Sequence, residues 1–183
     1  MVALTSLLLP LVLSAVFVFV ASSIIHMFLG YHANDFTPMP NEEVARAALR
    51  LPPGDYATPY AGSMAEMKSP EYTQKLQQGP IAFVTVAPPS ASSMGRSLTL
   101  WFVYCLVVSL FAAYIAGRAL GPGAHYLDVF RFAGATAFAG YALGGWSETI
   151  WFHRSAMTRV KNTFDGLIYA LLTAGTFGWL WPS

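Results

Sequence analysis

Glu148 is the residue of this sequence whose position most suggests chemistry. It lies four residues before the end of a long apolar stretch, Phe132–Phe152. An ionisable side chain within such a stretch is costly in a bilayer, so it usually pairs with another group or faces a cavity. The candidate partners are Arg154, His153 and His26. Glu148 is therefore either a proton or cation site, or a carboxylate that reaches the interface and pairs with a basic residue there.

Three more polar residues are expected near the same membrane face as Glu148 and His153. They are His26, His32 and Asp35, which lie at the end of the first apolar stretch or just after it. Two or three histidines with a carboxylate are the ligands that zinc and non-haem iron use. The spacing fits no standard motif, because His26 and His32 are six residues apart and no HExxH is present. These five residues are the candidate ion or metal site, with metal and cofactor unspecified; the alternative is a set of interfacial histidines that bind nothing.

Four long apolar stretches must position these residues. Each has about the 20 residues that a helix needs to cross a hydrocarbon core about 30 Å thick. Hydrophobic residues make up 55% of the 183-residue chain and charged residues 10%, compared with about 25% charged in a soluble domain. The sequence therefore predicts an all-α integral membrane protein with a bundle of four transmembrane helices. The stretches are Leu7–Leu29, Leu98–Ala119, Phe132–Phe152 and Phe164–Trp181.

One long hydrophilic loop separates the first predicted helix from the others. The expected parts are residues 1–29 (first transmembrane helix), residues 30–96 (loop) and residues 97–183 (three helices that pack with the first as one domain). Within the loop, Asn41 is expected to cap a short amphipathic helix, and Ser69–Gly79 brackets a second one. The apolar segment Ile81–Val86 is expected to be a strand or an extended segment.

The distribution of basic residues predicts the orientation. Four spans place both termini on one side of the membrane, together with Arg118 and Arg131, whereas the other eight Lys and Arg residues lie on the side of the long loop. Basic residues favour the cytoplasmic side. We therefore expect a bacterial inner-membrane protein with both termini outside the cytoplasm and the long loop inside it.

Small residues at four-residue spacing mark the faces on which the helices are expected to pack, because they let helix backbones approach closely. Packing within this chain and packing against another subunit are both open. The residues are Ala113, Gly117, Gly140, Gly144, Gly166, Ala170, Ala174 and Gly178. Asp165, at the start of the fourth stretch, is expected to cap that helix and to offset its dipole.

The sequence indicates a class of protein but no named family. A net charge of +1 provides no basic surface for nucleic acid. The first expectation is a non-enzymatic accessory, assembly or interaction subunit, whose partners are the bilayer and other membrane subunits or copies of itself. Two alternatives remain: a transporter or channel for a small solute, ion or proton, and a membrane enzyme or metal-binding protein with its histidine and carboxylate site at the cytoplasmic face.

Overall fold

The computed structural model describes residues 1–183 and is mostly helical. The chain divides into two compact units. The first joins Met1–Phe36 to Met94–Ser183, and the second is Thr37–Ser93. Every residue of the candidate site lies in the first unit, so that unit is the one that positions the site.

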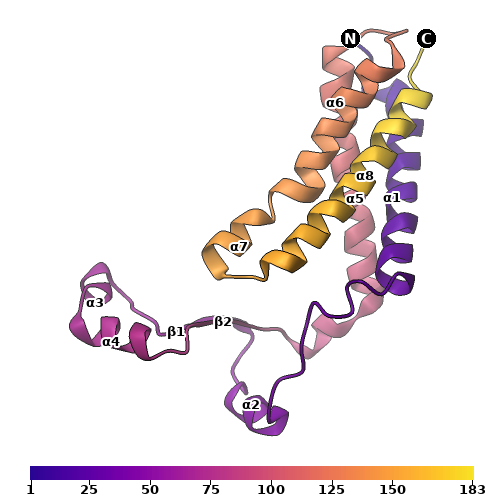
Figure 1. The fold of residues 1–183 in the computed structure, drawn as a ribbon. Helices are drawn as coiled ribbons and strands as arrows, with labels where there is room; N and C mark the ends of the chain where they lie inside the picture. Colours follow the sequence, from indigo (N-terminus) through magenta and orange to yellow (C-terminus); the bar gives the residue numbers. More distant parts are fainter. The chain divides into compact units, whose positions relative to one another are not determined.

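The first unit is built around four helices that pack in a ring. The helix α1 contacts α5, α5 contacts α6, α6 contacts α8, and α8 contacts α1. Both chain termini lie at one end of this unit (Figure 1). The elements are η1 (Leu4–Leu7), α1 (Leu8–Phe28), α5 (Met94–Ala119), α6 (Tyr126–Phe138), the π-helical η3 (Ala139–Leu143), α7 (Trp146–Phe152) and α8 (Ala156–Trp179).

Two of these helices are long and apolar enough to cross a membrane. They are the continuous helical segments Leu4–Phe28, with 25 residues, and Met94–Ala119, with 26 residues. The prediction of one continuous helix over Phe132–Phe152 is wrong. The chain passes from α6 through a π-helical turn and then bends at Gly144 and Gly145 before α7 begins. Both π-helical turns and pairs of small residues are established causes of helix bends.

The last helix begins earlier than the apolar stretch predicts. α8 starts at Ala156, and the Ser155 hydroxyl caps it by accepting a hydrogen bond from the backbone N–H of Thr158, 3.3 Å away. Asp165 therefore lies inside α8 and does not cap it, so the capping prediction for this residue is wrong. The first two turns of α8 are polar, which is why hydrophobicity alone placed the start of the helix too late.

Close contact between small residues holds the four helices together. A Cβ atom on Gly166 would lie 2.9 Å from the Cβ of Ala142, and one on Gly140 would lie 3.0 Å from Val108. All the predicted packing residues are in contact with or buried against neighbouring elements of this chain, except Gly144, around which there is open space. Two side-chain hydrogen bonds, Ser14 to Ser109 (2.7 Å) and Trp101 to Ser22 (2.8 Å), also link α1 to α5.

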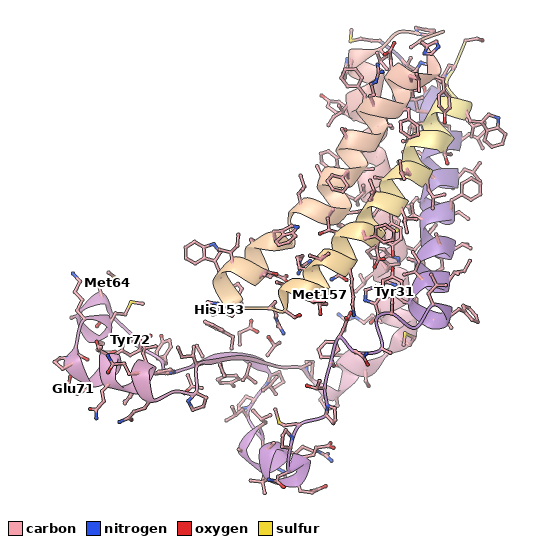
Figure 2. All side chains as sticks on the ribbon, in the orientation of Figure 1. Tyr31, Met64, Glu71, Tyr72, His153 and Met157 are labelled. Carbon is pink, nitrogen blue, oxygen red and sulfur yellow. The ribbon has the colours of Figure 1, made fainter.

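The second unit contains short elements and no buried residue. Its two strands pair antiparallel, with Tyr56 opposite Val84. The elements are α2 (Glu42–Ala48), β1 (Gly54–Thr58), α3 (Met64–Met67), α4 (Pro70–Gln78), β2 (Ala82–Val86) and η2 (Pro89–Ser92). The predicted second helix and the strand are present, whereas Asn41 has a left-handed backbone and makes no capping hydrogen bond. Figure 2 shows Met64 and Glu71 on α3 and α4.

A matched pair of glycine substitutions tests the packing. We expect Gly166→Leu to lower the free energy of unfolding by about 1–3 kcal/mol or more, because the added side chain meets Ala142. Gly144→Leu adds the same side chain where no atom lies within 4 Å, so we expect a change within about 0.5 kcal/mol. Thermal unfolding in detergent compares the two variants. An equal loss of stability in both variants would contradict this description of the helix contacts.

Candidate metal centre

The candidate site lies where α1 ends and the following turn packs on α8. His26 is in the last turn of α1, and Tyr31 and His32 are in the turn that follows Gly30. Gly30 has a φ of +67°, a left-handed conformation that glycine adopts without strain, and its carbonyl accepts a hydrogen bond from the Ala33 N–H. Figure 2 shows Tyr31 at this end of the first unit. The turn reverses the chain and lays two of its side chains against α8.

Three potential metal ligands meet at this point. His26, His32 and Asp165 each offer one nitrogen or oxygen atom, and these atoms all lie within 4.8 Å of one another. The His26 ring stacks on the His32 ring with centroids 4.5 Å apart, and His32 Nε2 lies 2.8 Å from Asp165 Oδ2. Two ligand atoms of a tetrahedral ion, each about 2.1 Å from it, are about 3.4 Å apart. His32 Nε2 and Asp165 Oδ2 lie at hydrogen-bond distance, so an ion between them would replace the hydrogen bond and move the two atoms slightly apart.

Both histidine rings are oriented through their Nδ1 atoms. His32 Nδ1 lies 2.5 Å from Asp35 Oδ2, and His26 Nδ1 lies 3.2 Å from the Ser22 carbonyl oxygen. In each case the ring donates its Nδ1 proton to an oxygen atom. Metal-binding histidines are held in this way by a carboxylate or a backbone carbonyl, which leaves Nε2 for the ion. The ligand atoms of the three residues lie within 4.8 Å of one another, which is wider than the spacing in a filled site. The exposed His26 side chain must therefore move closer to the other two ligands for an ion to bind.

The carboxylate of Asp165 is buried and has a second partner. Its side chain is 3% exposed, and the Tyr31 hydroxyl donates a hydrogen bond to Oδ1 while Oδ2 faces His32. Burial raises the pKa of Tyr31, and the neighbouring Asp165 carboxylate raises it further. Tyr31 therefore keeps its proton at neutral pH and acts as a donor. This contact fixes the direction in which Asp165 Oδ2 points.

Lys161 places a positive charge next to the Asp35 carboxylate. Its Nζ lies 2.7 Å from Asp35 Oδ1 and also donates to the Tyr31 carbonyl oxygen, 2.6 Å away. The hydrogen bonds from Lys161 and His32 lower the pKa of Asp35, so it is a carboxylate at neutral pH. Metal ligands bind in their deprotonated form, so an ion bound by His32 Nε2 would replace the contact of that nitrogen with Asp165 Oδ2.

The structure brings together three of the five predicted site residues. His26, His32 and Asp35 are joined by Asp165, whereas Glu148 lies elsewhere and pairs through Oε2 with Arg159 Nη2 at 3.1 Å. The Glu148 side chain is 59% exposed. The reading of Glu148 as part of an ion site with the histidines is therefore wrong, and the pair with Arg159 fits the other reading, a carboxylate paired with a basic residue, although the partner is neither Arg154 nor a histidine.

His153 is the fifth predicted residue and is not among the three ligands. It follows α7 in a left-handed conformation with a φ of +52°, in another part of the chain from the turn that carries His32.

Sequence reasoning missed Asp165, Tyr31 and Lys161 as members of the site. The position of Asp165 after polar residues, at the start of an apolar stretch, predicts a helix cap. The rule that selected Glu148, an ionisable residue within an apolar stretch, applies equally to Asp165 and would have found it. Nothing in the local sequence indicated Tyr31 or Lys161, because each acts through a contact with a residue more than 100 positions away.

We expect the ion network to contribute measurably to stability. Lys161→Met should lower the free energy of unfolding by about 1–3 kcal/mol, because it leaves the Asp35 carboxylate, 10% exposed, without its cation. Arg131→Met is the matched control, since its pair with Asp128 is 72% and 50% exposed and such pairs contribute about 0–1 kcal/mol. Chemical unfolding in detergent provides the comparison. Equal stability of the two variants would show that the network stabilises nothing.

Comparisons with known proteins give no family for this chain. No family model matches the sequence. The searches of curated proteins and of solved structures also found no match.

Proposed function

We propose that this chain is a membrane protein that binds one divalent transition-metal ion through His26, His32 and Asp165. The observation that carries this proposal is the orientation of the two histidines. Each has its Nδ1 paired with an oxygen atom, and the ligand atoms of both lie within 4.8 Å of a buried carboxylate. A network that served only to join a turn to α8 would not require the second histidine, since His26 contacts His32 only by ring stacking.

The ligand types favour zinc or ferrous iron. Two imidazole nitrogens and one carboxylate oxygen form the set found in catalytic zinc sites and in non-haem iron sites, whereas structural zinc sites have four protein ligands. With three protein ligands the ion keeps positions for water or a substrate. The proposal is therefore a metal-binding membrane protein with an open site, and it includes the possibility of an enzyme acting at the membrane face.

Exposed apolar side chains support a membrane location for all four helices of the ring. Leu9 on α1 is 64% exposed, Phe111 on α5 57%, Phe132 on α6 42% and Leu171 on α8 48%. Soluble monomers rarely expose large contiguous apolar surfaces. α8 has 24 residues. α6 has thirteen residues and η3 has five, so the two together rise about 27 Å. These lengths support four spans in a bundle, of which α1 and α5 are the most apolar.

The second unit favours an additional role as an interaction subunit. No residue of Thr37–Ser93 is buried. A segment of this size that buries so little apolar surface is marginal by itself and gains stability by docking on another surface. A partner subunit or another copy of this chain would provide such a surface. This role is compatible with metal binding, because the site lies in the first unit.

Metal binding can be measured directly on the purified protein. We expect one Zn²⁺ or Fe²⁺ per chain by elemental analysis after dialysis, and a stabilisation of about 2.7 kcal/mol at 100 times the dissociation constant. His26→Ala and Asp165→Asn remove a ligand each and should abolish both effects. His153→Asn is the control: it removes a histidine outside the cluster and suits the left-handed backbone at this position.

The variants also separate metal binding from simple charge pairing. If His26→Ala binds the ion as well as His153→Asn does, then His26 is not a ligand and the proposal is wrong. If Asp165→Asn unfolds the protein, His26→Ala still tests the site, because the His26 side chain is exposed and its hydrogen bond is to the Ser22 carbonyl oxygen and not to a carboxylate.

The proposed orientation places the metal site on the cytoplasmic side. We expect a reporter that is active only outside the cytoplasm to work when fused after Ser183 and to fail when inserted within Gly54–Ser63, because basic residues are concentrated on the loop side. A cytoplasmic reporter at the same two positions is the control. The reverse pattern would move the site to the opposite compartment.

A further inference from the structure

The short helix α7 exposes large apolar side chains at the end of the first unit. Ile150 is 64% exposed, Trp151 73% and Phe152 53%. These residues follow one another in a helix of seven residues that continues from α6 and η3 after a bend. In Figure 1, α7 leads away from α1 and α5 at the end of the unit opposite the termini. Ile150 and Trp151 are the most exposed of the three.

Polar side chains of α7 form hydrogen bonds and an ion pair with α8. Trp146 Nε1 donates to Thr163 Oγ1 at 3.1 Å, and Glu148 pairs with Arg159. The Arg159 guanidinium also lies against Gly145, where an added Cβ atom would overlap with it. These interactions fix α7 against α8 by its polar groups, so the exposed side chains are held outward by the fold.

The position of α7 along the chain is that of a membrane interface. α6 and η3 together rise about 27 Å, close to the thickness of the hydrocarbon core of about 30 Å. If Tyr126 lies at one interface, Leu143 lies at the other, and α7 begins just beyond it. Tryptophan is enriched at this depth because its ring is apolar while its N–H needs a polar partner.

Charge and size favour lipid over a second copy of this chain as the partner of α7. Arg154 lies two residues after the end of α7 and is exposed, which suits an anionic headgroup. A seven-residue helix is about 10 Å long. It is too small to supply the roughly 800 Å² per partner that a stable protein interface buries.

We infer that α7 is an interfacial helix that places Ile150 and Trp151 among the lipid headgroups, at the end of the bundle that carries the metal site. This inference rests on the proposed membrane location but not on metal binding. α7 is then an anchor that fixes how deep the bend between α6 and α7, and the first turns of α8, lie in the membrane. Asp165 is in the same helix as those turns, so the anchor also fixes the depth of the metal ligands.

Single cysteines in lipid nanodiscs test the inference. In a Cys105→Ala background, which removes the buried native thiol, Trp151→Cys should react with a water-soluble maleimide at least about tenfold more slowly than Gln77→Cys. A rise of one unit in the thiol pKa near lipid reduces the reactive thiolate tenfold. Gln77 is exposed on α4, and Phe111→Cys, midway along α5, is the control for the hydrocarbon core.

Depth-dependent quenching identifies what covers α7. A fluorophore attached to the Trp151→Cys variant should be quenched more by lipids brominated near the headgroup than by lipids brominated at the chain ends. The reverse is expected for the same fluorophore on the Phe111→Cys variant. If maleimide labels Trp151→Cys as fast as Gln77→Cys, the inference is overturned. Cross-linking of two copies of Trp151→Cys without lipid quenching would overturn it in favour of a second copy.

The Phe111→Cys control also tests the proposed membrane location separately from the inference about α7. If this variant reacts as fast as Gln77→Cys, the membrane location itself fails, and the inference about α7 fails with it. If Phe111→Cys is protected while Trp151→Cys is fully reactive, the bundle is in the membrane and only the inference about α7 is wrong.

Discussion

The buried carboxylate of Asp165 is the constraint on which the candidate site depends. Removing a carboxylate from water is costly unless other groups donate hydrogen bonds to it. Asp165 obtains these from Tyr31 and His32, which come from the turn after α1. The turn must therefore lie against α8, and this placement brings Asp35 within reach of Lys161. The end of the bundle is organised around the need to satisfy one charge.

Close packing of the helices makes this arrangement possible. α1 and α8 meet through Ala15, Val18, Ile25 and Tyr169, which form one buried cluster with Cys105 of α5. This packing places the end of α1 beside the middle of α8. The ligand atoms of His26 and Asp165 then lie within 4.8 Å of each other. The proposed metal centre is thus a consequence of helix packing as well as of ligand chemistry.

The bend between α6 and α7 divides the polar groups at this end of the unit into two sets. Glu148 goes with α7 and pairs with Arg159, whereas Asp165 stays within the bundle. One acidic residue is thereby exposed and balanced by an arginine, and the other is buried and aimed at histidine. Only the second arrangement orients ring nitrogens toward a common point, which is why it supports ion binding.

The sequence by itself determined the helical class and local elements such as α4, which Ser69 and Gly79 bracket. These features depend on composition and on residues within one or two helical turns of each other. It also selected His26, His32 and Asp35. Only the tertiary structure decided that Asp165 replaces Glu148 as their partner and that β1 pairs with β2. Such contacts depend on how distant segments pack, and no local pattern contains that information.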